Sequence, residues 1–247
     1  MRQTRILMGM PVTVQVGDSV LAAEAVEAVY AYFTYVDETF STYKESSEIS
    51  RINAGRLAEA QWSADMRSVM TACQQTKVET GGYFDISRNG RLDPSGYVKG
   101  WAIQNAAALL DDMNLRDYYV DAGGDIQAAG LSESGQPWIV GIRNPFNREE
   151  VIKRVSLSNM GMATSGTYVR GQHIYDPHDP DRPLTELVSL TVIGSSIVDA
   201  DRYATAAFAM GRSGIDFLAA LPGFTCYAVD QQGLATFTPE FANFVLP

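Results

Sequence analysis

The stretch Tyr118-Tyr-Val-Asp-Ala-Gly-Gly-Asp-Ile-Gln-Ala-Ala129 predicts two strands joined by a tight turn. Tyr118, Tyr119 and Val120 favour a strand in the segment 118–121, and a second strand is expected at 125–129, around Ile126. Gly123-Gly124 between them suits a hairpin turn, because glycine readily adopts the positive φ angles that such a turn requires. A hairpin pairs its strands antiparallel, so this stretch is the first indication of an antiparallel sheet.

Further apolar patterns on both sides of the hairpin predict the rest of the fold. The expected strands are an alternating one at Val12–Val16 and residues 138–143, 151–157, 187–193, 226–230 and 234–237. The expected helices are residues 21–40, a helix with Ser63 as N-cap that ends at Gly81-Gly82, and residues 98–113, 199–210 and 215–221, with a loop or short helix at 41–53. Helices and strands are grouped and do not alternate strictly, so the predicted class is α+β.

The length of 247 residues is sufficient for a large core without disulfides or a structural metal. No repeat or linker divides the chain, and we expect one domain over residues 1–247, built as two closely packed lobes. Charged residues are 19% of the chain and hydrophobic residues 46%, which excludes a disordered or coiled-coil protein.

The charge and the rare residue types exclude several classes of function. A net charge of −10 without any basic run argues against nucleic-acid binding. The two histidines, His173 and His178, are too few for a zinc site with three imidazoles, and they form no HExxH motif. Cys73 and Cys226 form no CxxC motif, and we expect two buried thiols.

The N-terminal segment has the alternation of a strand and not the profile of a leader. Pro11 and Gln15 interrupt its apolar residues, and no stretch in the chain approaches the 18 apolar residues typical of a membrane span. We therefore expect no membrane insertion, no export signal and a cytoplasmic location.

The segment Asp199-Ala-Asp-Arg-Tyr-Ala-Thr-Ala-Ala-Phe-Ala-Met210 holds the most informative polar pair. Asp201 and Thr205 are four residues apart, so they share one face of the predicted helix. A carboxylate beside a hydroxyl is a hard-oxygen pair that suits magnesium. An alternative is that the acidic residues only stabilise the helix N-terminus, with Asp199 or Asp201 as its N-cap.

Two other segments also allow a functional and a structural interpretation. In Leu92-Asp-Pro-Ser-Gly-Tyr-Val-Lys-Gly-Trp101, Ser95-Gly96 can present backbone groups to a ligand, or can simply be a turn that opens a helix, with Asp93 and Lys99 as a surface ion pair. The run Thr164-Ser-Gly166 can contact phosphate or can be ordinary loop. His173, in an alternating stretch, is an acid–base group or a packed imidazole.

In this order, the segments resemble the ApbE family of FAD:protein FMN transferases. The motifs that carry the resemblance are Met8-Gly-Met10, Phe40-Ser-Thr-Tyr-Lys-Glu-Ser-Ser-Glu-Ile-Ser-Arg-Ile-Asn53, Gly82-Tyr-Phe-Asp85, Asp93-Pro-Ser-Gly-Tyr-Val-Lys-Gly100, Ala122-Gly-Gly-Asp-Ile126, Ala163-Thr-Ser-Gly166, His173-Ile-Tyr-Asp-Pro177 and Asp199-Ala-Asp-Arg-Tyr-Ala-Thr205. The resemblance implies an ApbE-like fold of mostly antiparallel sheets flanked by helices.

The resemblance also implies an activity and its residues. FMN is moved from FAD to a threonine or serine of a partner redox protein through a phosphodiester bond, with release of AMP. The implied FAD contacts are Met8, Tyr43, Tyr83, Phe84, Asp85, Asp93 and Lys99. The implied magnesium ligands are the side chains of Asp201 and Thr205 and the backbone carbonyl of Gly96, and His173 is an implied acid–base group near the reacting phosphate.

Three departures from the family pattern leave other functions open. Met10 replaces the usual threonine, Gln104 replaces a common aspartate, and Asp176-Pro-His-Asp-Pro180 replaces an Asp-Pro-x-Thr-Gly loop. The alternatives are a magnesium-dependent hydrolase that splits FAD into FMN and AMP, and a flavin-binding protein without turnover. The sequence identifies neither the acceptor protein nor the oligomeric state.

Overall fold

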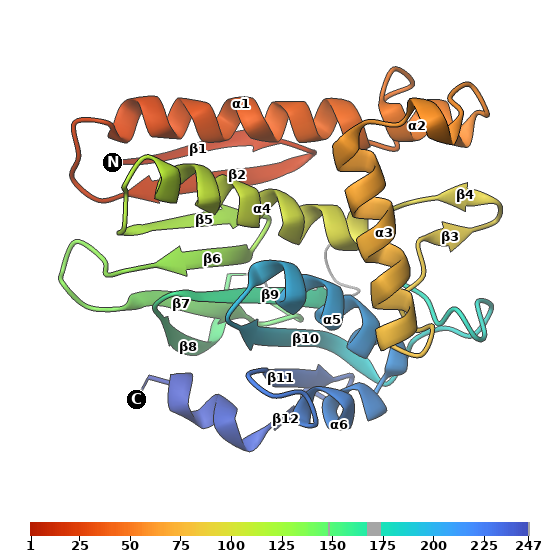
Figure 1. The fold of residues 1–247 in the computed structure, drawn as a ribbon. Coiled ribbons are helices and arrows are strands. Elements are labelled where there is room, and N and C mark those ends of the chain that lie inside the picture. Colours follow the sequence, from red (N-terminus) through yellow and green to blue (C-terminus); the bar gives the residue numbers. More distant parts are fainter. Residues whose placement is uncertain (148, 167–173, 247) are drawn as a thin grey trace.

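The computed structural model describes residues 1–147, 149–166 and 174–246, and it is organised around one large sheet (Figure 1). Eight strands, antiparallel throughout, lie in the order β1 (Arg2–Leu7), β2 (Met10–Val16), β5 (Tyr118–Ala122), β6 (Asp125–Ala129), β9 (Met160–Gly166), β10 (Leu187–Gly194), β11 (Thr225–Asp230) and β12 (Ala235–Phe237). The predicted hairpin forms the β5–β6 pair at the centre of the sheet, with Gly123 and Gly124 at φ angles of 67° and 102°.

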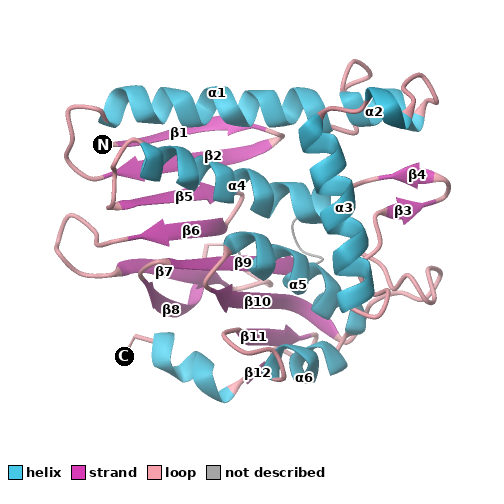
Figure 2. Ribbon diagram, viewed as in Figure 1, coloured by secondary structure: helices cyan, strands magenta, loops and turns pink. Residues whose placement is uncertain are grey.

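Helices cover one face of the sheet (Figure 2). They are α1 (Ala22–Phe40), α4 (Ser95–Asp112), α5 (Ile197–Met210) and α6 (Ser213–Ala219), which pack on β2, β5, β9 and β11 in turn. Helix α3 (Ala64–Glu79) crosses the ends of α4 and α5 (Figure 1), next to the short helices α2 (Glu48–Asn53) and η1 (Glu59–Gln61) and the small hairpin β3 (Ser87–Arg88)–β4 (Arg91–Leu92).

The opposite face of the sheet carries a second, smaller hydrophobic cluster. The hairpin β7 (Trp138–Arg143)–β8 (Val151–Leu157) and the C-terminal helix η2 (Pro239–Phe244) pack there, with Trp138, Leu157 and Phe241 as large buried side chains. The structure thus has two hydrophobic clusters that share one sheet, and the expectation of one domain with two packed lobes stays a prediction. Within the described residues, we find no helix that is both long and apolar enough to cross a membrane.

Helices α4 and α5 approach each other closely because glycines line their contact. A Cβ atom at Gly100 would lie 2.8 Å from Cβ of Asp201 and 2.9 Å from the carbonyl oxygen of Ile197, closer than atoms can pack. At Gly96, the same atom would meet Thr205 Cγ2 at 3.3 Å, a tight contact that a shift of a few tenths of an ångström would relieve. This spacing brings the first two turns of α4 against residues 197–205 of α5, so that Lys99 of α4 lies near Asp201 of α5.

Several sequence-based expectations are confirmed. The fold class is α+β, Ser63 caps α3 by accepting a hydrogen bond from the Met66 amide, and Cys73 and Cys226 are free and buried. The segment left open as loop or short helix contains α2, which Ser47 caps through the Ser50 amide.

Three expectations are wrong in detail. The segment of Thr164-Ser-Gly166, considered as possible loop, belongs to β9, which the pattern did not predict because small residues weaken the strand signal. The N-cap of α5 is Ser196, which accepts from the Asp199 amide, so neither Asp199 nor Asp201 has that role. Helix α4 begins at Ser95, three residues before the predicted start.

Candidate active site

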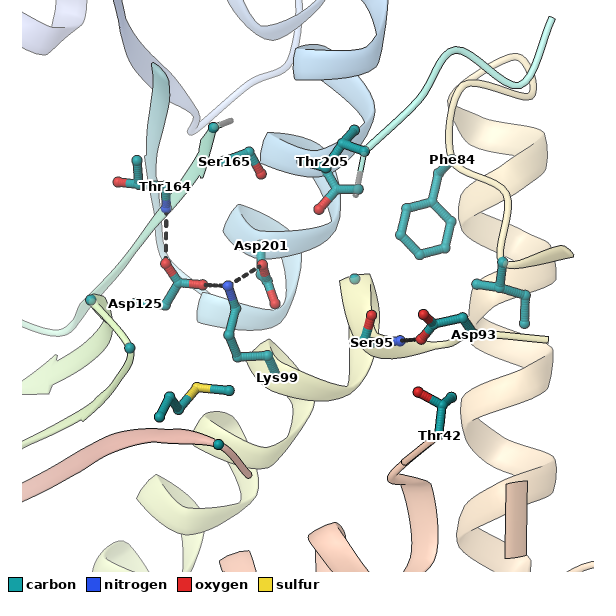
Figure 3. Close-up of a pocket in the computed structure, with 18 of the residues that line it drawn as sticks. Thr42, Phe84, Asp93, Ser95, Lys99, Asp125, Thr164, Ser165, Asp201 and Thr205 are labelled. Atoms are coloured by element: carbon teal, nitrogen blue, oxygen red, sulfur yellow. Dashed lines mark hydrogen bonds and ion pairs between the residues drawn. The ribbon is translucent and has the colours of Figure 1, made fainter. Parts of the chain in front are cut away.

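A cavity of about 990 Å³ opens where the β5–β6 turn, the end of β9, the start of α4 and the middle of α5 meet (Figure 3). Most of the residues predicted to bind FAD or magnesium line it: Tyr43, Tyr83, Phe84, Asp85, Asp93, Gly96, Lys99, Asp201 and Thr205. Met8 lies in the turn before β2, and the cavity wall runs through its neighbours Gly9 and Met10. His173 lies outside the described residues.

Asp201 lies on the face of α5 that borders the cavity. Its side chain is only 3% exposed, and its Oδ2 accepts a hydrogen bond from the Gly100 amide at 2.8 Å. Thr205 follows one turn later, and its Oγ1 would lie 3.5 Å from a Cβ atom at Gly96. The predicted pair therefore does share one face, and the glycines of α4 bring that helix against it.

The ammonium group of Lys99 lies between two buried carboxylates, those of Asp125 and Asp201 (Figure 3). It forms an ion pair with Asp125 Oδ2, and its distance to Asp201 Oδ1 is 3.5 Å. Asp125 is itself 2% exposed, and its Oδ1 accepts a hydrogen bond from the Thr164 amide at 2.9 Å. Two carboxylates and one ammonium group leave this buried cluster with one excess negative charge.

Burial of this cluster shifts the pKa of Asp201. Burial raises its pKa above the ordinary carboxyl value, the Lys99 ammonium opposes that rise, and the nearby Asp125 carboxylate adds to it. A buried carboxylate that is only partly compensated is stabilised by a proton or by a cation. The cluster is therefore suited to a cationic ligand at the cavity wall.

The oxygens around Asp201 fit a magnesium ion. Magnesium usually binds one or two carboxylates and fills its other positions with phosphate and water oxygens. Asp201 could supply the carboxylate, Thr205 a hydroxyl and Gly96 a backbone carbonyl, and all three residues line the cavity. In the part of the chain that the structure describes, no group of three or more His, Cys, Asp or Glu side chains is arranged around a metal position.

Comparison with known proteins assigns the chain to a family. The model of the ApbE family matches residues 8–90 and 87–228, which together cover most of the sequence and every element of the cavity wall described above. The chain belongs to the ApbE family.

Curated ApbE relatives match over part of their length. A protein of Salmonella typhimurium named FAD:protein FMN transferase is 29% identical over 168 residues, which is 63% of this chain and 48% of the relative. A protein of the same name from Haemophilus influenzae is 33% identical over 131 residues, 49% of this chain and 38% of the relative. The chain thus matches about half or less of the length of these relatives.

Solved ApbE structures share the whole fold. The flavin transferase ApbE from Vibrio cholerae superimposes with a TM-score of 0.83 at 22% identity, over 99% of this chain and 98% of that chain. The ApbE protein from Thermotoga maritima gives a TM-score of 0.88 at 23% identity, over 100% and 99% of the two chains. At these identities, the likeness establishes the ApbE fold.

Two aromatic residues that line the cavity, Tyr83 and Phe84, are packed against neighbouring residues. Phe84 is buried and would lie 3.4 Å from a Cβ atom at Gly96. The Tyr83 ring packs edge-to-face against His178 with 4.6 Å between ring centroids, and Nε2 of His178 lies 3.0 Å from the Gly81 carbonyl oxygen. The second histidine, in the segment that departs from the ApbE pattern, thus supports a predicted flavin contact from outside the cavity.

The charged residues of the wall have definite partners. Asp85 forms an ion pair with Lys77 at 2.6 Å, and Oδ1 of Asp93 accepts from the Ser95 amide at 3.1 Å. The proposed turn that opens a helix is therefore confirmed at residues 93–95. The alternative of a surface ion pair for Lys99 is wrong, because its ammonium group is directed to the two buried carboxylates.

Asp125 is a site residue without a role among the predictions from sequence. Asp125 appears there only within the motif Ala122-Gly-Gly-Asp-Ile126, because an aspartate after a Gly-Gly turn is common in hairpins without any function. The available signal was its position: Asp125 is the first residue of β6, directly after a tight turn, and so lies at the end of its strand. Thr164 and Ser165 line the same cavity, as the phosphate interpretation of that segment requires.

Proposed function

We propose that the chain transfers the FMN half of FAD to a threonine or serine hydroxyl of an acceptor protein and releases AMP. The observation that carries this proposal is the buried Asp125–Lys99–Asp201 cluster, in which the described side chains leave one negative charge beside a large cavity, in a member of the ApbE family. The names of the relatives support the same reaction.

The cavity suits a dinucleotide. Its volume of about 990 Å³ lies at the upper end of the range of about 300–1,000 Å³ that is usual for ligand sites. Tyr43, Tyr83 and Phe84 offer aromatic surface for ring systems, and Tyr43 is 97% exposed at the rim. We propose that these side chains pack against FAD, and that Asp85, Asp93 and Met8 complete its binding site.

Asp201, Thr205 and the Gly96 carbonyl would hold a magnesium ion. When bound, this ion supplies charge neutralisation and polarisation at the pyrophosphate. The chain needs both, because its net charge of −10 repels a dianionic substrate. Lys99 adds a fixed positive charge at the same wall and attracts the phosphate oxygens.

The proposed reaction is a single displacement at the FMN phosphorus. The acceptor hydroxyl oxygen forms a new bond to this phosphorus, and the phosphoanhydride bond to the AMP oxygen breaks. The hydroxyl proton passes to a base, the role we propose for His173, and AMP departs with the electron pair of the broken bond. The protein residues orient the two reactants and need form no covalent bond themselves.

The test is incubation of the protein with FAD and Mg²⁺, with and without candidate acceptor subunits of redox proteins. We expect AMP release that depends on the acceptor, equimolar flavin fluorescence on the acceptor in a denaturing gel, and loss of both in EDTA. AMP and FMN released at the same rate without acceptor identify the hydrolase. Bound yellow flavin without AMP identifies a binding protein, and either result overturns the transferase proposal.

A further inference from the structure

Asp125 is buried in the cavity wall, yet the proposed reaction uses neither of its oxygens. It begins β6 directly after the Gly123-Gly124 turn. Its Oδ1 is fixed by the Thr164 amide of the neighbouring strand, at 2.9 Å, and its Oδ2 forms the ion pair with Lys99. One carboxylate oxygen is thus fixed by the sheet, through the Thr164 amide, and the other is directed to Lys99 of helix α4.

Lys99 has one positive charge and two buried carboxylates within reach. Its ammonium group pairs closely with Asp125 and stays 3.5 Å from Asp201 Oδ1. Coulomb attraction increases as distance and effective dielectric fall, so an ammonium group without Asp125 would close on Asp201. Asp201 would then be neutralised by an internal cation and would lose its attraction for an external one.

We infer that Asp125 is a positioning residue that holds the Lys99 ammonium away from Asp201 and so keeps Asp201 available to a divalent cation. The inference rests on the proposed cation site. With both carboxylates charged, the cluster carries one net negative charge, whereas without the charge of Asp125 it carries none. The affinity of the empty protein for a divalent cation should therefore depend on Asp125 through Lys99.

The experiment measures Mn²⁺ binding to the FAD-free protein by electron paramagnetic resonance of free Mn²⁺. Manganese suits the same oxygen ligands as magnesium and is directly visible by this method. In Asp125→Asn, the amide oxygen still accepts from Thr164, so the substitution removes mainly the charge. We expect Mn²⁺ to bind this variant about tenfold more weakly, which corresponds to about 1.4 kcal/mol.

A second substitution separates charge compensation from a structural role. In the double variant Asp125→Asn with Lys99→Met, the cluster again carries one net negative charge, and we expect Mn²⁺ affinity to return close to the wild-type value. Wild-type affinity in the single Asp125→Asn variant overturns the inference. So does a double variant that binds as weakly as the single one, because Asp125 would then act as a structural residue or as a direct ligand.

Asp230 provides a matched control on β11. It is also a buried carboxylate, 5% exposed, and it pairs with Arg212 at 2.8 Å away from the cavity lining. Asp230→Asn should leave Mn²⁺ affinity unchanged. If circular dichroism shows that Asp125→Asn does not fold, the single variant Lys99→Met provides the test. Without the ammonium group, Asp201 and Asp125 should bind Mn²⁺ more tightly than in wild type. Equal or weaker Mn²⁺ binding overturns the inference.

The same preparations distinguish this inference from the proposed function. Suppose that wild type binds Mn²⁺ and transfers FMN, and that Asp125→Asn binds Mn²⁺ with unchanged affinity. This result supports the transferase proposal and overturns only the positioning role of Asp125. If Mn²⁺ binding depends on Asp125 as expected but wild type releases no AMP, the positioning role of Asp125 is supported and the transferase proposal is overturned. No Mn²⁺ binding at all removes both.

Discussion

Neighbouring residues of α5, Asp201 and Arg202, belong to two charge clusters of the same composition. Arg202 points away from the cavity and forms ion pairs with Glu79 of α3 and, at 2.7 Å, with Asp199. It also donates to Thr76 Oγ1 at 3.2 Å. Each cluster thus contains two carboxylates and one cationic side chain, and each has one excess negative charge.

The two clusters differ in exposure. The side chains of Asp199 and Glu79 are 36% and 39% exposed, whereas those of Asp125 and Asp201 are 2% and 3% exposed. The first cluster links α3 to α5, and water solvates its excess charge, so no bound ligand is needed to compensate that charge. The excess charge of the second is enclosed by protein, and among the described side chains no further cation compensates it, so it suits a ligand or a proton. Burial, and not composition, marks the functional cluster.

The largest expected effect comes from removing the buried carboxylate of Asp201, which belongs to the enclosed cluster. We expect Asp201→Ala to lower AMP release from FAD about 100-fold or more, because loss of outer contacts of metal ligands alone costs 10–100-fold. Asp199→Asn, in the exposed cluster, should turn over close to wild type and lose at most about 1 kcal/mol of stability. Turnover rates of the two variants check this, and near-wild-type AMP release in Asp201→Ala contradicts the magnesium assignment.

The close contact between α4 and α5 allows a second test, on stability. Gly100→Ala places a Cβ atom 2.8 Å from Asp201 Cβ, and we expect a loss of about 1–3 kcal/mol in the free energy of unfolding. Gly96→Ala meets its nearest neighbour at 3.3 Å and gains helix propensity of about 1 kcal/mol, so its stability should be unchanged or higher. Urea denaturation measures both, and equal losses would show that the glycines have no separate packing roles.

The pH dependence of stability tests the enclosed charge directly. Because the pKa of Asp201 is raised in the folded state, its contribution to stability is fully present below the ordinary carboxyl pKa of about 4 and is lost as pH rises through the raised value. In metal-free buffer, wild type should therefore lose stability relative to Asp201→Asn as pH rises towards neutrality. Mg²⁺ at neutral pH should restore wild type and not the variant. A difference that is independent of pH contradicts the assigned burial effect.

The smallest expected effect concerns an exposed carboxylate at the cavity rim, Asp93. Its Oδ1 accepts from the Ser95 amide, and we propose that it contacts FAD. Asp93→Ala should raise the KM for FAD about fivefold, equivalent to about 1 kcal/mol, with little change in kcat. Steady-state kinetics with varied FAD provide the measurement, with Asp199→Asn as the exposed-carboxylate control. A large loss of kcat at unchanged KM would show that Asp93 acts in turnover, as proposed for Asp201, and not in FAD binding.

Local patterns predicted those features that depend on neighbours in sequence. The β5–β6 hairpin follows from Gly123-Gly124 between two strand-forming segments, and the shared face of Asp201 and Thr205 follows from their spacing on a helix. The interpretation of Asp93-Pro-Ser as a helix opening also follows from local chemistry, since Asp93 accepts from an amide two residues away. Strand β9 was missed, because its small residues are held in the sheet by β6 and β10 rather than by their own propensity.

By itself, the sequence determined the α+β class, the main helices and the helix face that carries Asp201 and Thr205, because all of these depend on contacts within a few residues. Only the tertiary structure decided that Lys99 pairs with Asp125 and Asp201 rather than with Asp93. That choice depends on the close approach of α4 and α5 at Gly100 and on the strand pairing that delivers Asp125 to the same point. Burial of a charge is a property of the assembled fold, and no local pattern encodes it.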